Sequence, residues 1–237
     1  MLSVYVLTLR QLTGKWRLLI LTVLAALPVI VSLLVMGSSN TPSVAEFETV
    51  VFSGMLAGSI IPLVVLAIAS AAFANEVEDR TLANLTLSPV PRWQIVVPKL
   101  LAAITIAAPF IAASAFITSD AAFLGDTRAS FAVTAAAVVG VALYSSAFVW
   151  LGLVTTQAIG LGLLYIVLWE GFFSGFVSGV RLLSIRHYAI SVMHAIDPRR
   201  FAASDNLGTL PVIAIVVLVF GGFLLLSVRR LRQMDVP

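Results

Sequence analysis

Cysteine is absent from this sequence of 237 residues, and charged side chains make up only 11% of it. The absence of cysteine excludes disulfides, thiolate metal sites and cysteine nucleophiles. A soluble domain carries about 25% charged residues, so the low charge and the 60% share of hydrophobic residues exclude an ordinary water-soluble protein. Basic residues form no stripe interleaved with aromatics, which argues against a nucleic-acid partner. We therefore expect an integral membrane protein.

Long uncharged runs predict where the chain crosses the membrane, because a helix needs about 20 apolar residues to do so. One run of 41 residues, 129–169, is long enough for two spans, and the polar Thr155–Gln157 stretch predicts the turn between them. The runs lack the alternation of barrel strands. We therefore expect one all-α domain over 1–237 with six transmembrane helices, within 18–36, 49–75, 100–119, 129–154, 158–179 and 206–228.

The distribution of basic residues predicts the orientation. Six spans place both termini on one side, and the positive-inside rule makes the more basic side cytoplasmic. Five basic residues fall on the other side, and nine fall on the side of the termini: Arg10, Lys15, Arg17, Arg80, Arg92, Lys99, Arg229, Arg230 and Arg232. We therefore expect a multi-pass protein of the cell (inner) membrane with both ends in the cytoplasm.

The first residues, 1–17, are apolar around much of a helix, with Arg10 and Lys15 late in the stretch. This pattern predicts an interfacial helix lying on the membrane, which Gly14 turns into the first span. The alternative is that the stretch only extends the first span.

A cytoplasmic loop over 75–97 separates the second and third spans, and it begins NEVEDRTLANLTLSPVPR. Leu82 and Leu85 give one helical turn an apolar face. Pro89 and Pro91 then end that helix. Trp93 is expected at the membrane interface, and Lys99 is expected to extend its ammonium group toward water. We predict a short helix held between two spans by a rigid turn.

This loop resembles the one between the second and third spans of ABC-2-type transporter permeases. Three residues depart from that pattern: Arg80 and Pro98 stand where the family usually has glycine, and Ala83 replaces a glutamate. The residues that match are Glu76, Glu78, Thr81, Leu82, Leu85, Ser88, Pro89, Val90, Arg92, Lys99 and Leu100.

The resemblance implies the transmembrane subunit of an ATP-driven ABC transporter, usually an exporter, rather than an enzyme. Two permease copies would pair, as a homodimer or a heterodimer, and each would rest on a cytoplasmic ATPase subunit. Glu76, Glu78, Thr81, Leu82, Leu85, Ser88, Pro89 and Arg92 would form the element that docks on the ATPase. Because the sequence has no Gly-x-x-x-x-Gly-Lys-Ser/Thr loop, ATP and Mg would be held by the partner, and no cofactor is expected on this chain.

Glu170 is the ionisable residue that falls well inside a predicted span. A charge in that position is a candidate functional site by default. It would line a substrate path, bind a cation or proton, or cap a helix broken near Gly171, Gly175 and Gly179. The four-residue spacing of these glycines also fits a helix-packing surface, either within the chain or between two copies.

The extracytoplasmic connection over 181–207 has an apolar side and is expected to dip back into the membrane as an amphipathic hairpin. His187 and His194 lie two helical turns apart without a third ligand at metal-site spacing, so we favour interfacial polar roles over a metal site. Arg199 and Arg200 would meet lipid head groups or stay solvated.

Other functions fit less well. A six-span intramembrane serine protease needs the string Gly-x-Ser-Gly, with one residue between the first glycine and the serine. Here two residues separate Ser174 and Ser178 from the glycine before each of them. A secondary transporter without an ATPase is the alternative hypothesis, although the two halves of the sequence, 1–118 and 119–237, lack the similarity that an inverted repeat would give. A haem-maturation type of ABC exporter subunit stays open, because Ser88–Pro91 reads SPVP.

Overall fold

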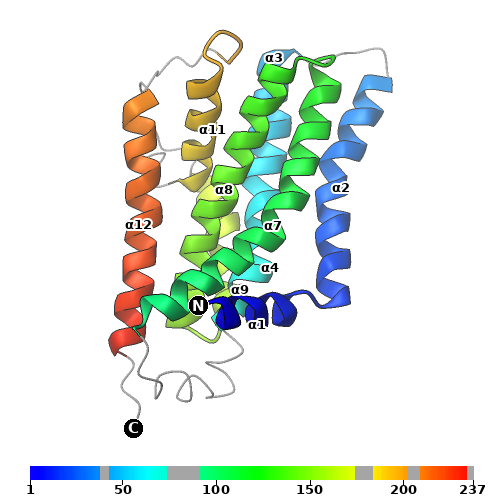
Figure 1. Ribbon diagram of the computed structural model, residues 1–237. Helices are drawn as coiled ribbons and strands as arrows, with labels where there is room; N and C mark the ends of the chain where they lie inside the picture. The colour runs from blue at the N-terminus through cyan, green and yellow to red at the C-terminus, as the bar shows by residue number, and fades with distance from the viewer. Residues whose placement is uncertain (38–42, 74–90, 174–183, 202–208, 234–237) are drawn as a thin grey trace.

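The fold is known from a computed structural model that describes residues 1–37, 43–73, 91–173, 184–201 and 209–233. Every regular element in these residues is a helix, and the long helices stand side by side (Figure 1). In chain order they are α1 (Leu2–Leu12), α2 (Lys15–Gly37), α3 (Val44–Glu46), η1 (Phe47–Ile60), α4 (Ile61–Ala69), α7 (Trp93–Ala122), α8 (Thr127–Val154), α9 (Ala158–Leu164), η2 (Tyr165–Phe173), α11 (Ile185–Ile196) and α12 (Thr209–Gln233).

Five helices in the described residues are long and apolar enough to span a membrane: Lys15–Val35, Val44–Phe73, Trp93–Ala122, Thr127–Val154 and Thr209–Gln233. They correspond to five of the six spans expected from the sequence. The turn expected at Thr155–Gln157 is confirmed, because α8 ends at Val154 and α9 begins at Ala158. The remaining expected span, 158–179, is described only as far as Phe173, where α9 and η2 follow one another.

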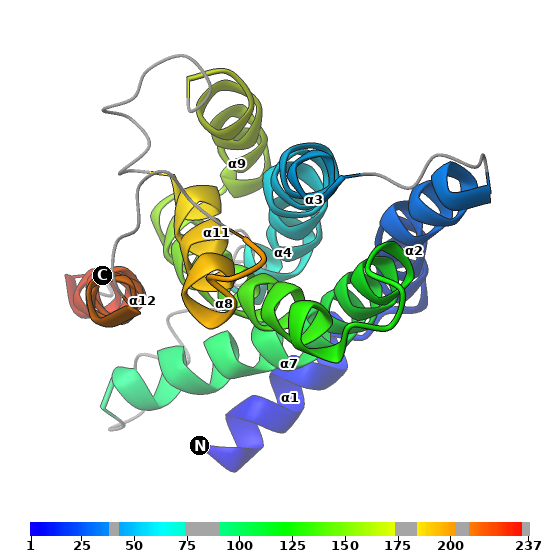
Figure 2. The same ribbon diagram turned by 90° about the horizontal axis from the view of Figure 1, so that it is seen from above.

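Helices α7 and α8 form the centre of the bundle. Helix α2 packs on α7, α11 and α12 pack on α8, and α4 contacts both central helices; Figure 2 shows this arrangement from above. Small residues allow the close approach that membrane helices need. A Cβ atom on Gly152 of α8 would lie 2.6 Å from the carbonyl oxygen of Ser70, just after α4, so only glycine fits there.

Helix α1 is separate from α2 and lies across one end of the bundle (Figure 1). The break falls at Thr13 and Gly14, where the expected turn into the first span was placed. The Tyr5 hydroxyl donates a hydrogen bond to Oγ1 of Thr105 on α7 over 3.1 Å. Helix α7 begins at the same end and bends before it rises, and it contains Pro98 and Pro109, the residue type that kinks helices.

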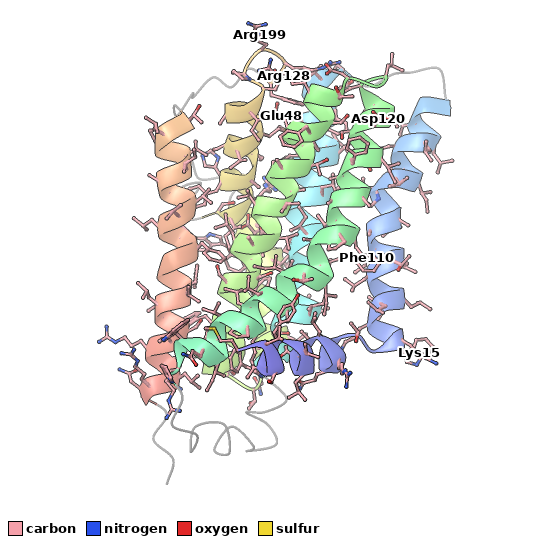
Figure 3. The ribbon with its side chains drawn as sticks, viewed as in Figure 1. Lys15, Glu48, Phe110, Asp120, Arg128 and Arg199 are labelled. Carbon is pink, nitrogen blue, oxygen red and sulfur yellow. The ribbon has the colours of Figure 1, made fainter. Side chains whose placement is uncertain are left out.

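The two ends of the bundle carry different sets of charged side chains (Figure 3). Lys15 lies at the end that carries α1 and the last turn of α12, whereas Glu48, Asp120 and Arg128 lie at the opposite end. The last turn of α12 holds further basic residues, Arg230 and Arg232. Within the described residues, the end with α1 is therefore basic, and the opposite end carries both signs.

Candidate functional site

The predicted docking element falls almost wholly outside the described residues. This applies to Glu76, Glu78, Thr81, Leu82, Leu85, Ser88 and Pro89. Arg92 is described: it precedes α7, is half-buried, and its carbonyl oxygen accepts the first hydrogen bonds of that helix from Ile95 and Val96. The structure therefore describes only the residues on either side of this loop, up to Phe73 and from Pro91 onward. The roles of the loop residues stay predictions.

Lys99 joins the two spans that flank this loop. The expectation that its ammonium group reaches toward water is wrong, because Lys99 is only 2% exposed. Its Nζ donates a hydrogen bond to the carbonyl oxygen of Ala72 over 2.5 Å and lies 4.4 Å from the centre of the Phe73 ring. A buried ammonium group needs such partners, and the end of the second span provides them. Lys99 thus fastens the start of α7 to the residues just after α4.

Glu170 is fully buried, and its carboxylate sits at the first turn of α11. Its Oε1 accepts hydrogen bonds from the Tyr165 hydroxyl and the Ile185 backbone N–H, each over 3.0 Å. Its Oε2 accepts one from the Ser184 hydroxyl over 2.6 Å. A carboxylate that binds the free N–H groups of a helix start is a capping arrangement, and it also complements the helix dipole. The sequence analysis expected a cap on a helix broken near Gly171, but Glu170 caps α11 instead, and η2 continues through Gly171 to Phe173. Gly175 and Gly179 lie outside the described residues.

Arg186 extends this buried junction from α11 to η1. Its Nη1 donates a hydrogen bond to the Glu170 carbonyl oxygen over 3.3 Å. A Cβ atom on Gly58 would lie 3.1 Å from the same nitrogen, so glycine leaves room for the guanidinium group. The Tyr144 hydroxyl bonds the Ala57 carbonyl oxygen over 3.4 Å. Both η1 and η2 are π-helical, a geometry that is rare and often found at functional sites, and Arg186 and Glu170 link the two.

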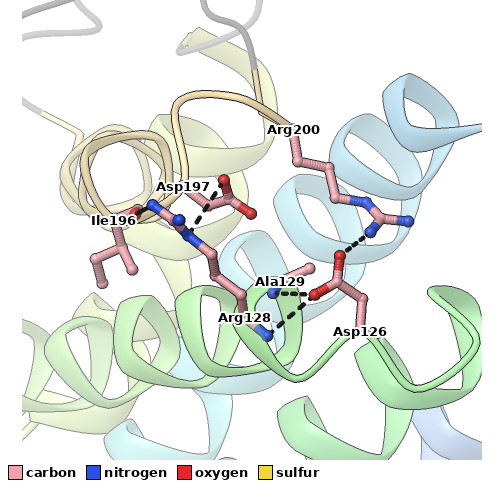
Figure 4. A network of polar contacts seen from close by, with 6 residues as sticks. All are labelled: Asp126, Arg128, Ala129, Ile196, Asp197 and Arg200. Atoms are coloured by element: carbon pink, nitrogen blue, oxygen red, sulfur yellow. Dashed lines mark hydrogen bonds and ion pairs between the residues drawn. The ribbon is translucent and has the colours of Figure 1, made fainter.

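Two ion pairs join the residues that follow α11 to the start of α8, at the end of the bundle away from α1 (Figure 4). Arg200, which follows α11, pairs with Asp126 at the start of α8, and its guanidinium lies 4.5 Å from the Phe123 ring centre. Arg128 lies 3.7 Å from Asp197. Asp126 also accepts hydrogen bonds from backbone N–H groups of α8, and the one from Ala129 is the main reason its pKa lies below the usual range, with Arg128 and the charge of Arg200 adding to it. Arg200 is thus a structural ion-pair partner.

His194 makes a third link between α11 and its neighbours. Its Nε2 lies 2.7 Å from Oε1 of Glu48 on η1, with both side chains mostly buried. His187, two turns earlier on α11, has its ring 6.2 Å from that of Tyr188. The two histidines therefore contact different surroundings. Helix α11 itself, whose amphipathic pattern was expected, packs into the bundle against α8, η1 and α12.

A family model described as ABC-2 family transporter protein matches residues 9–185, about three quarters of the chain. The chain belongs to this ABC-2 transporter family. No curated protein sequence matches it. The matched region of this permease runs from the end of α1 to the first residue of α11, so it contains Lys99, Glu170, Ser184 and Ile185. The permease is accordingly a multi-pass membrane subunit of a transport system, which agrees with the five helices in its described residues that are long and apolar enough to span a membrane.

Several residues of the permease that organise the site were not singled out from the sequence. Arg186 and Glu48 were missed because their partners are distant along the chain, 16 residues for Arg186 and 146 for Glu48. Asp126 carried a usable signal, since an aspartate three residues before a long apolar run is a common helix cap. Asp126 caps α8 in this way.

Proposed function

We propose that this permease is the transmembrane subunit of an ATP-driven ABC exporter, with ATP hydrolysed by a separate cytoplasmic ATPase. Membership of the ABC-2 family carries the proposal. ATP and Mg would be bound by the ATPase, and this chain would provide the path for the substrate. Two permease copies, identical or different, would form the transmembrane part, with one ATPase beneath each.

The distribution of basic residues between the two ends of the bundle supports an inner-membrane protein whose two termini both lie in the cytoplasm. Met1, the end of α12, and the flanks of the loop over 74–90 lie at one end of the bundle (Figure 1). In the described residues more arginines and lysines lie toward this end, Arg10, Lys15, Arg17, Arg92, Arg229, Arg230 and Arg232, than at the opposite end, which has Arg128, Arg199 and Arg200. The positive-inside rule then places the basic end in the cytoplasm. In this orientation α1 lies flat at the cytoplasmic membrane surface as an interfacial helix.

Coupling would pass from the loop to a pair of helices that move together. Leu82 and Leu85 would dock on the ATPase through their apolar side chains. Lys99 bonds α7 to the carbonyl of Ala72, and α4 packs on both α7 and α8. A displacement of the loop would therefore reach the centre of the bundle through two attached spans. Glu170 would hold α11 in place at the junction of the π-helical segments, so that this motion reaches the opposite end.

The test is co-purification with the ATPase encoded beside this chain, followed by ATP turnover. Leu82→Asp and Leu85→Asp are compared with wild type. Leu124→Asp is the matched control, because Leu124 is an 81% exposed leucine in the turn between α7 and α8, at the opposite end of the bundle. We expect the loop variants to lose ATPase binding and stimulated turnover, and Leu124→Asp to keep both.

The outcomes separate the two transport mechanisms. A stable complex that only the loop substitutions disrupt supports ATP-driven coupling through Leu82 and Leu85. If no ATPase binds to the wild-type chain, and the loop variants transport as well as wild type does, the proposed ATP-driven mechanism is wrong.

A further inference from the structure

Two cavities lie along the contact of α8 and α12, and both are lined by Trp150. The first, of about 340 Å³, is also bordered by α9, η2 and α11, and its lining of aromatic and aliphatic side chains includes Phe148, Tyr165, Tyr188, Val219 and Phe223. The second, of about 490 Å³, is lined by Trp150, Val154, Leu226, Arg229, Arg230 and Gln233. Trp150 of α8 therefore adjoins both cavities.

The α12 residues in these cavities form one stripe of the helix. Val219, Phe223, Leu226 and Arg230 are separated by four, three and four residues, which places them on one face. The stripe rises about 16 Å along the helix axis. This is about half of the ~30 Å hydrocarbon thickness of a bilayer, or one leaflet. The groove is thus as long as one leaflet is deep, and its polarity changes only at the last helical turn.

The basic end of the groove has unused hydrogen-bonding capacity. Nε of Arg230 is buried and has no hydrogen-bond partner in the described part of the chain. In the same part, no acidic side chain pairs with Arg229 or Arg230. A buried guanidinium nitrogen without an acceptor is costly, and phosphate oxygens are acceptors that match the guanidinium fork. This observation favours an anionic phosphate ligand at the end of the groove.

We propose that the groove between α8 and α12 binds one anionic glycerophospholipid. Its phosphate lies against Arg229 and Arg230, and an acyl chain runs past Trp150 along Val219 and Phe223. An inorganic phosphate or a soluble anion would leave the apolar first cavity empty, so the cavity favours a ligand that also carries an acyl chain. The lipid fills the contact between α12 and the rest of the bundle, where α12 is otherwise little buried.

The test uses the delipidated full-length protein and native mass spectrometry. Phosphatidylglycerol and phosphatidylcholine are titrated separately into the wild type and the variants. Arg230→Gln is compared with Arg232→Gln, which removes the same charge from an exposed position on the other side of α12. Val219→Trp, which fills the apolar cavity, is compared with Val217→Trp at a 64% exposed position that does not line it.

We expect one phosphatidylglycerol per chain, bound more tightly than phosphatidylcholine. Arg230→Gln should weaken it about fivefold to tenfold, because it removes both a positive charge beside the phosphate and a charge-assisted hydrogen bond. Val219→Trp should also weaken binding, and the two control variants should bind as wild type does. Equal binding of the two lipids by the wild type, or equal losses at Arg230 and Arg232, would overturn the proposal.

A further arm distinguishes a lipid from free phosphate. Inorganic phosphate at millimolar concentration should leave phosphatidylglycerol bound, and its displacement at that concentration would show that the site takes the free anion instead. These measurements need neither an ATPase nor transport, so their result does not depend on the ATP-driven mechanism.

Discussion

The Nζ atom of Lys99 on α7 lies 2.5 Å from the carbonyl oxygen of Ala72, 27 residues earlier in the chain. This bond joins the two spans on either side of the predicted docking loop. The carbonyl oxygen belongs to Ala72, just after α4, and the Lys99 side chain is buried beside it. The ammonium group of Lys99 therefore connects α7 to the residues just after α4.

Replacing Lys99 by methionine keeps the length of the side chain but removes the donor. We expect a loss of about 1–3 kcal/mol in stability, because the Ala72 carbonyl is left without this donor, and a weaker stimulation of ATP turnover. Thermal unfolding in detergent and turnover with the ATPase check these effects. Lys15→Met is the control, since Lys15 is exposed at the same end of the bundle. Equal effects of the two substitutions would show that the bond to Ala72 has no special role.

Glu170→Gln should impair transport while the complex still assembles. The amide keeps one acceptor oxygen but loses the charge that faces the start of α11, so the cap on Ile185 weakens. Loss of a helix cap costs about 0.5–2 kcal/mol, and amide hydrogen exchange over Ile185–Ile196 should speed up accordingly. Wild-type transport in this variant would contradict a functional role for the carboxylate.

Ser184→Ala separates positioning from direct contact with a substrate or ion. It removes one donor to Glu170 and the N-cap side chain of α11 but leaves the carboxylate charge in place. If Glu170 acts by holding α11, Ser184→Ala should reproduce both the faster exchange and part of the transport defect. Normal transport together with faster exchange would instead favour a direct role of the charge.

The spans could be predicted from the sequence because they follow from local composition. The turn at Thr155–Gln157 and the break at Gly14 were both located, since each interrupts a long apolar run with residues that favour a turn. Membrane insertion depends on the summed hydrophobicity of about 20 residues. The summed hydrophobicity of a segment does not depend on how the helices pack against one another, so the sequence alone predicts the spans.

The contacts of the charged residues could not be predicted in the same way. Lys99 was expected to point toward water because it lies near a span end, but the acceptor at Ala72 is supplied by a different helix. The Arg186 guanidinium group has room because Gly58 in η1 has no side chain. The sequence around Arg186 gives no sign of this distant glycine. Such partners are set by helix packing, so they appear only when the bundle is assembled.

We expect the contribution of Asp126 to the stability of the fold to be lost in acid. The pKa of its carboxyl is lowered in the folded protein, mainly by the backbone N–H of Ala129. The contribution is therefore present above the ordinary aspartate pKa of about 3.9 and is lost as the pH falls through the lowered folded-state value. Melting temperatures from pH 7 to pH 3 should drop less for Asp126→Asn than for wild type.

Two further variants show which interaction of Asp126 matters. Asparagine is also a good helix cap, so Asp126→Asn mainly removes the pairing with Arg200, whereas Asp126→Ala removes the cap as well. We expect the alanine variant to melt lower at pH 7. Asp120→Asn should follow the wild-type pH profile, because its side chain makes no ion pair in the described part of the chain. Equal pH profiles for the wild type and Asp126→Asn would contradict the assigned shift.

The contact between Glu48 and His194 predicts a cross-link that fixes α11 against η1. Because the chain has no cysteine, the double substitution Glu48→Cys, His194→Cys introduces the only two thiols. A short bifunctional thiol reagent should join them within one chain, since the wild-type side chains approach to 2.7 Å. Glu48→Cys, His187→Cys is the control, because position 187 lies two helical turns, about 10 Å, farther along α11. Mass spectrometry of the digested protein identifies the linked peptides. Equal cross-linking of both pairs would mean that α11 is not held in this register.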